Sequence, residues 1–303
     1  MPVAVSKAAP SRSATRTKHA APGRADSEAP LTWVDIIRDA VFGFTDVAAL
    51  PAAYFALSRV PKGDGHAVLV LPGFLSTDQT TWPLRWYLTQ VGYAVHPWAL
   101  GYNMGFSTEH HYDIEALVEQ RLKEVFIESG DRKISLVGWS LGGVYAKYLA
   151  RRHPNLIRDV VTLGSPISGD TSEVSVWRVY QWVTKMEFSD PEFKRILREH
   201  NQPLEGVPIT ALFSKKDGVV PWRNAREKPG PLVQNAEVDA THLGMGFDAF
   251  VFYLIAHRLA KSAARTWRPL DVSALARRFQ RERLPRAVPS GETKNKRAGQ
   301  WND

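Results

Sequence analysis

Short apolar runs alternate with segments of helical spacing from His66 to Ser262. The apolar runs are 66–71, 93–100, 133–138, 158–166, 207–214 and, more weakly, 235–240. Apolar residues recur three or four positions apart in the segments 82–92, 113–129, 141–152 and 246–262. Unbroken apolar runs are typical of strands buried on both faces, and intervening helices join such strands in parallel. The sequence therefore predicts an α/β fold, with a mostly parallel central sheet covered by helices on both faces.

A serine stands between two glycines where the run 133–138 gives way to the helical segment 141–152. The residues are Gly138-Trp139-Ser140-Leu141-Gly142. A G-x-S-x-G match arises by chance in about one chain in ten of this length, so the flanking strand and helix carry the argument. In that context the glycines permit a sharp turn that holds the serine out as a nucleophile at a helix N-terminus.

A serine hydroxyl is a weak nucleophile and needs a histidine base, which follows late in the chain on such a scaffold. His242 is the expected base, because it lies in THLG, between a strand end and a helix. His200 precedes the end of the strand 207–214, and His257 lies inside a helix. A loop histidine at position 242 is free to reach the serine.

The histidine in turn needs a carboxylate, which is expected directly after the strand 207–214. There the chain has SKKDGVVPW, in which Asp217 precedes a glycine. Asp-Gly is also a common turn pair, so a plain turn is the alternative interpretation. Asp170 and Asp239 are the other candidate carboxylates.

Acyl transfer also requires two backbone N–H groups for the oxyanion of the tetrahedral intermediate. One is expected from Leu141, directly after the nucleophile. The other is expected from the loop LPGFLSTD after the first strand, where Phe74 or Leu75 can supply it and Gly73 makes room for the turn.

The chain resembles the α/β-hydrolase superfamily, in its esterase/lipase branch. The matching segments are VLVLPGF, WALGYNMG, SLVGWSLGG, VVTLGSPISG, SKKDGVVPW and THLG. The resemblance implies a Ser-Asp-His hydrolase that uses Ser140, Asp217 and His242, without a metal or an organic cofactor. One departure concerns the oxyanion loop, where many lipases have His-Gly and this chain has Pro72-Gly73.

In this fold, an insertion between the strands 158–166 and 207–214 usually forms a cap over the nucleophile. Here the expected helical cap spans about 168–206 and is rich in aromatic residues. An acyl-binding lid and ordinary packing onto the sheet explain this composition equally well. The residues that we expect to line the substrate pocket are Trp139, Met104, Trp177, Trp182 and Phe188. Asn103 is either a hydrogen-bond donor behind the site or a turn residue.

The net charge of +8 comes from the two ends of the chain. Residues 1–30 carry a net +3 and residues 261–303 a net +7, so the stretch between them carries −2. This distribution gives no indication of a specific nucleic-acid site. We expect a disordered basic tail at 1–30, an amphipathic helical segment at 31–62, the hydrolase domain at 63–265 and a basic, partly disordered tail at 266–303.

The chain has no cysteine, which excludes disulfides and thiolate catalysis but does not fix the compartment. The N-terminus lacks the apolar core of a signal peptide. A cytoplasmic protein is therefore expected, with peripheral membrane contact through the helical segment 31–62 as an alternative. The expected activity is hydrolysis of a small-molecule or lipid ester with an apolar acyl chain. An acyltransferase with the same triad, a binding module on a hydrolase fold and a membrane-surface scaffold are the rival interpretations. The sequence predicts no oligomeric state.

Overall fold

The computed structural model describes residues 50–105, 113–168, 191, 195, 199, 202–262 and 267–283 of the 303-residue chain. The predicted tail at 1–30, most of the predicted helical segment 31–62 and most of the predicted cap at 168–206 lie outside these residues. Among the described residues, no helix combines the length and the apolar character that a membrane span needs.

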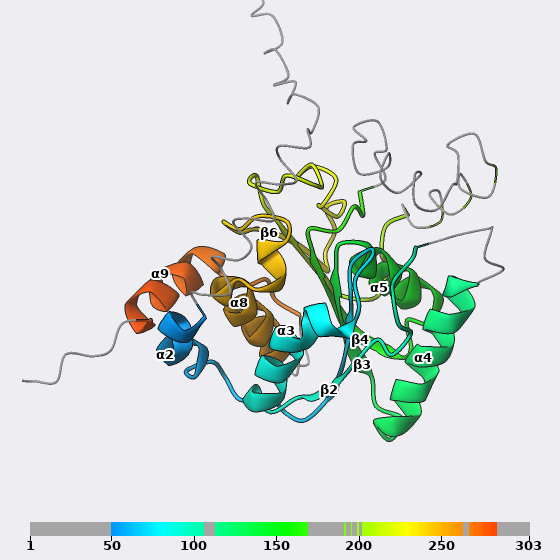
Figure 1. Cartoon of the computed structure of the whole chain (residues 1–303), viewed down its shortest axis with the longest axis horizontal. Helices are drawn as coiled ribbons and strands as arrows, with labels where there is room; N and C mark the ends of the chain where they lie inside the picture. Colours follow the sequence, from blue (N-terminus) through cyan, green and yellow to red (C-terminus); the bar gives the residue numbers. More distant parts are fainter. Residues whose placement is uncertain are drawn as a thin grey trace, which may run out of the picture. The chain divides into compact units, whose positions relative to one another are not determined.

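A six-stranded parallel sheet forms the centre of the fold (Figure 1). Its strands are β1 (Ala67–Leu71), β2 (Ala94–His96), β3 (Ile134–Trp139), β4 (Ile157–Leu163), β5 (Ile209–Phe213) and β6 (Val233–Glu237). Their order across the sheet is β2-β1-β3-β4-β5-β6, and every neighbouring pair is parallel. The predicted α/β architecture is thus confirmed.

Helices cover both faces of this sheet (Figure 1). The helical elements are η1 (Pro51–Ala53), α2 (Tyr54–Leu57), α3 (Asp78–Val91), α4 (Ile114–Glu128), α5 (Leu141–Arg152), η2 (Gly244–Gly246), α8 (Ala249–Ser262) and α9 (Val272–Glu282). One buried cluster joins α2, α3, α8 and α9 to the side chains of Val68 and Val70. A second joins α4 and α5 to Leu69 and Leu71, because successive strand residues point to opposite faces.

Helix α3 begins four residues earlier than the apolar spacing predicts. Its first turn, Asp78-Gln79-Thr80-Thr81, is polar and carries no periodic signal. The start is set by Thr77, whose side chain accepts a hydrogen bond from the backbone N–H of Gln79 at 3.3 Å. The helix therefore follows the expected oxyanion loop directly.

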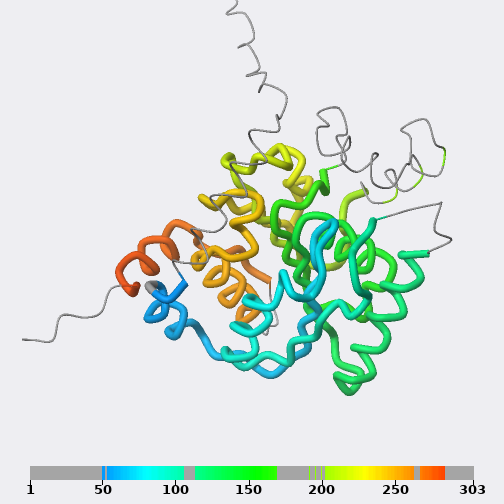
Figure 2. Tube along the Cα trace, in the orientation of Figure 1, coloured from blue at the N-terminus to red at the C-terminus, as the bar shows by residue number. Residues whose placement is uncertain are grey.

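Helix α9 lies within 266–303, which we expected to be a partly disordered tail. Asp271 caps it by accepting from the N–H of Ala274 at 2.9 Å, and Phe279 is buried against α8. Figure 2 shows this last segment, in orange, beside the blue segment that begins at residue 50. Arg59 Nη1 joins the two by donating to the carbonyl of Glu282 at 3.0 Å. The segment 266–303 thus contains an ordered helix, whose apolar spacing the arginines of α9 mask in the sequence.

Candidate active site

Four loops meet at the carboxyl edge of the sheet. They follow β1, β3, β5 and β6, and carry residues 72–76, Ser140, Asp217 and His242 respectively. In parallel α/β sheets this edge is where ligands bind. The topology alone thus brings together residues that are up to 170 positions apart in the chain.

Ser140 lies on a strained turn between β3 and α5. Its backbone φ of 53° and ψ of −122° fall in a region that residues other than glycine rarely occupy. A Cβ on Gly138 would come 2.4 Å from the carbonyl oxygen of Gly142, and a Cβ on Gly142 would come 2.2 Å from that of Leu71. Both glycines are therefore required for the close backbone approach that forms this turn.

The structure brings Ser140, His242 and Asp217 into one hydrogen-bonded series. His242 Nε2 lies 3.0 Å from Ser140 Oγ, and His242 Nδ1 lies 2.8 Å from Asp217 Oδ2. The other oxygen of Asp217 accepts from the backbone N–H groups of Val219 at 2.9 Å and Val220 at 2.7 Å. The side chain of Asp217 is fully buried, so every partner of this carboxylate counts in fixing its orientation.

The alternative acids and bases lie elsewhere or outside the described residues. The side chain of Asp239 is 79% exposed and pairs with Lys216 Nζ at 2.7 Å. His257 lies on α8, with its ring centroid 4.5 Å from that of Tyr253. Burial lowers the pKa of His257 to about 4, so this ring is neutral at ordinary pH. Asp170 and His200 are outside the described residues.

Gly164 contributes to the site in a way that the sequence reasoning missed. It follows β4 with a φ of 53°, and a Cβ at this position would lie 2.8 Å from Asp217 Oδ2 and 3.1 Å from His242 Nδ1. The backbone directly after β4 therefore packs against both Asp217 and His242, at a position where only glycine leaves room. The available signal was the glycine in VVTLGSPISG, at a strand end beside the serine strand.

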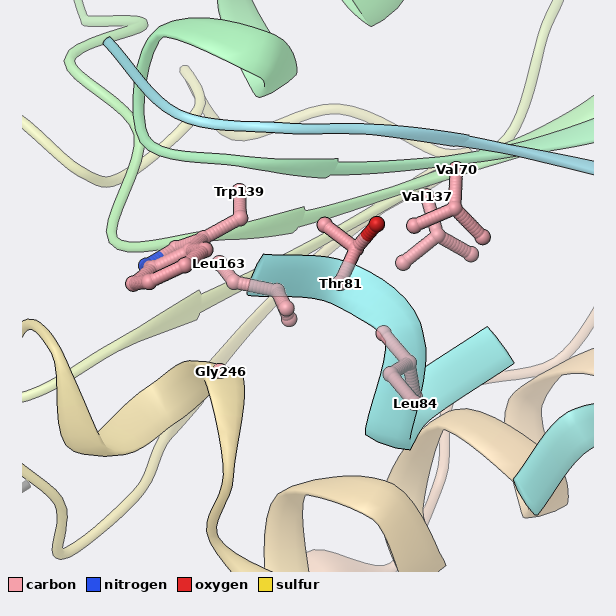
Figure 3. A pocket seen from close by; sticks show the side chains of 7 residues that line it. All are labelled: Val70, Thr81, Leu84, Val137, Trp139, Leu163 and Gly246. Atoms are coloured by element: carbon pink, nitrogen blue, oxygen red, sulfur yellow. The ribbon is translucent and has the colours of Figure 1, made fainter. Parts of the chain in front are cut away.

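Trp139, which we expected to line the substrate pocket, packs into the core beside the site. It is buried, and its Nε1 donates to the backbone carbonyl of His242 at 3.1 Å. Figure 3 shows its ring near Gly246, beside a void of about 10 Å³ that is also lined by Thr81 and Leu163. That volume holds about one water molecule, which is too little for an acyl group.

One of the two candidates for the second oxyanion donor is engaged within the protein, because the N–H of Leu75 donates to the carbonyl of Asn103 at 2.8 Å. Phe74, the other candidate, directly precedes Leu75 in the same loop. Leu141 is the first residue of α5, where N–H groups have no acceptor within their own helix.

Two apolar side chains are exposed on the loop that borders Ser140 and on the loop bonded to it. Leu75 is 46% exposed and Met104 is 41% exposed. Their loops are joined through the hydrogen bond between Leu75 and Asn103. The other residues expected in the pocket, Trp177, Trp182 and Phe188, lie outside the described residues.

Known proteins match the chain over the same region. The model of the "Alpha/beta hydrolase family" matches residues 68–292. "Serine hydrolase BPHL" of Mus musculus is 24% identical over 205 residues, which cover 57% of this chain and 70% of that protein. A crystal structure of Bacillus licheniformis lipase BlEst2 gives a TM-score of 0.48 at 15% identity, over 66% of this chain and 94% of that one. The monoacylglycerol lipase of Paleococcus ferrophilus gives 0.47 at 18%, over 67% and 97%.

Proposed function

The chain belongs to the alpha/beta hydrolase family, and from this premise we propose that it hydrolyses carboxylic esters through Ser140, His242 and Asp217. The observation that carries the proposal is the pair of hydrogen bonds on His242, 3.0 Å to the serine hydroxyl and 2.8 Å to the carboxylate. A serine aligned with both a base and an orienting acid is the arrangement that nucleophilic acyl transfer needs.

In the proposed reaction, Ser140 Oγ attacks the ester carbonyl while its proton moves to Nε2 of His242. Asp217 accepts from Nδ1–H, which fixes the tautomer that leaves Nε2 free to act as a base. The imidazolium that forms is stabilised by the buried carboxylate, and it then gives its proton to the departing alcohol. Water, activated by the same nitrogen, releases the acid from Ser140.

The negative charge on the tetrahedral oxygen needs donors that are already in place. The N–H groups of Leu141 and Phe74 are the proposed donors, because the first begins α5 and the second lies in the loop against the nucleophile. A Cβ on Gly73 would lie 3.3 Å from Ser140 Cβ, so this loop passes directly beside the serine. Donors that lie so near to the serine need no rearrangement during the reaction.

The proposed substrate is an ester with an apolar acyl chain, of small-molecule or lipid origin. Exposed Leu75 and Met104, on the two loops joined beside the serine, support this choice. Each buried methylene contributes about 0.8 kcal/mol, or roughly a fourfold gain in kcat/KM. A p-nitrophenyl ester series from acetate to decanoate should therefore show kcat/KM rising over several carbons.

Ser140→Ala tests the proposal directly. The variant should lose ester hydrolysis and covalent labelling by a fluorophosphonate, because the acyl-enzyme forms on this oxygen. Ser165→Ala, which removes a buried serine after β4, is the matched control and should still be labelled. Labelling that persists in Ser140→Ala would show that another residue is the nucleophile, and no turnover of any ester by the wild type would remove the proposed function.

A further inference from the structure

Asn103, in the loop after β2, is completely buried and bonded to the oxyanion loop by both its side chain and its backbone. Its Nδ2 donates to the carbonyl of Pro72 at 2.9 Å. Its backbone carbonyl accepts from Leu75 N–H at 2.8 Å, and its backbone N–H donates to the carbonyl of Ser76 at 2.9 Å. Three contacts from one residue thus hold both ends of the segment 72–76.

The segment that Asn103 holds is strained. Leu75 has a φ of 56°, in the left-handed region that leucine avoids. Such a conformation persists only where the surroundings impose it, and strained residues cluster at functional sites. The bond from Leu75 N–H to Asn103 fixes this residue directly, so the conformation of the turn depends on Asn103.

The same turn presents the proposed donor. Gly73 and Ser76 close it, since the N–H of Ser76 donates to the carbonyl of Gly73 at 3.3 Å and its Oγ donates to the same oxygen at 2.7 Å. Phe74 lies between Gly73, which borders Ser140, and Leu75, which is held by Asn103. Phe74 therefore lies between two residues whose positions are fixed.

Asparagine is suited to this position because its side chain both donates and accepts. While Nδ2 donates to Pro72, Oδ1 accepts from the N–H of Gly105 at 3.2 Å and from the hydroxyl of Tyr145 at 3.4 Å. Tyr145 lies on α5, the helix that begins at the nucleophile. The side chain thus connects the oxyanion loop, its own loop and the nucleophile helix.

We propose that Asn103 is a positioning residue that holds the 72–76 turn against Ser140, so that this turn supplies the second donor to the developing oxyanion. The inference rests on the proposed ester hydrolysis and adds a residue that acts without touching the substrate. Its loss should weaken binding of the transition state more than binding of the substrate, because the oxyanion exists only after attack.

Asn103→Asp and Asn103→Ala test the proposal. The first keeps the volume and loses the donor to Pro72, and the second loses the whole side-chain connection. In both, kcat on p-nitrophenyl butyrate should fall by roughly 10- to 100-fold while KM changes by less than about threefold. Rates are expressed per active site, titrated with a fluorophosphonate, so that an unfolded fraction does not count as lost kcat.

A boronic acid that mimics the tetrahedral intermediate provides a second readout. Its inhibition constant should rise by the same factor by which kcat/KM falls, since both report on the oxyanion donors. Asn235→Ala is the matched control. Asn235 also donates to a backbone carbonyl and accepts from a backbone N–H, both of Glu227, at 2.9 Å and 2.8 Å. This variant should lose thermal stability and keep kcat per active site.

Wild-type kcat per active site in both Asn103 variants would overturn the inference and leave the proposed hydrolysis intact. The same holds if the loss lies entirely in KM, or if Asn235→Ala loses as much kcat as Asn103→Ala. If the wild type turns over no ester but still binds the boronic acid, the proposed function fails. The dissociation constant of the boronic acid, measured by direct binding to wild type and both variants, then tests the role of Asn103.

Discussion

Trp139, the residue before the proposed nucleophile, donates a hydrogen bond from its indole to the backbone carbonyl of His242, 3.1 Å away. The two rings also lie close, with centroids 6.4 Å apart, and the indole packs edge-on against Phe247 at 6.1 Å. Strand β3 therefore leads directly into Ser140, and its last residue, Trp139, holds the loop that carries His242. The alignment of the two depends on a single buried side chain.

Trp139→Phe should lower kcat by roughly two- to tenfold, because it keeps most of the ring and removes a hydrogen bond of about 0.5–1.5 kcal/mol. Steady-state rates per titrated active site measure this effect. Trp98→Phe is the control, since Trp98 is also buried and its Nε1 has no hydrogen-bond partner among the described residues. Equal losses in the two variants would show that packing, and not the bond to His242, matters.

Asp217→Asn should lower kcat by on the order of 10³–10⁴ and leave the fold intact, because the amide favours the wrong tautomer of His242. Asp239→Asn should remain near wild type, since that side chain is exposed and pairs with a lysine. Kinetics with circular dichroism on both variants check this. If Asp239→Asn is inactive and Asp217→Asn is active, the acid is assigned to the wrong residue.

Gly164→Ala should reduce kcat by about 10²-fold or more, because its Cβ would displace Asp217 and His242, and small misplacements are costly in catalysis. Gly130→Ala is the control, as Gly130 also has a positive φ, of 69°, and its Cβ would meet no atom within 4 Å. Both changes should destabilise by on the order of 1 kcal/mol. Similar kcat values in the two variants would contradict the role of Gly164.

The free energy of unfolding should fall as the pH drops from about 6.5 to about 4. Burial lowers the pKa of His257 to about 4, so within this range the unfolded chain binds a proton that the folded chain does not. His257→Leu should make the free energy of unfolding depend less on pH. The loss of free energy between about pH 6.5 and about pH 4 should be smaller in the variant, by on the order of 3 kcal/mol. Urea titrations at several pH values provide the measurement, and an unchanged pH dependence would refute it.

Features that depend on local pattern could be predicted from the sequence. Strands β1, β3, β4 and β5 are visible because both of their faces are buried. The order of motifs along the chain pointed to Ser140, Asp217 and His242, which the structure brings within hydrogen-bonding distance. Features that depend on backbone direction could not be predicted. The hydrogen bond that engages the N–H of Leu75 depends on Asn103, 28 positions later, and the burial of Trp139 depends on the direction in which its ring turns. Gly164 matters because its backbone packs against Asp217 and His242, which lie 53 and 78 positions later in the chain.

During synthesis on the ribosome, Ser140 emerges first, then Asp217 and then His242. Ser140 and His242 are 102 positions apart, and β4, β5 and β6 all lie between them. At a synthesis rate of about 5–20 residues per second, the serine waits for roughly 5–20 s before its base is made. A nascent chain therefore carries an inert serine until the edge strand β6 has joined the sheet. In the proposed mechanism, hydrolysis therefore requires the finished sheet, and a chain that stops before His242 has no base for Ser140.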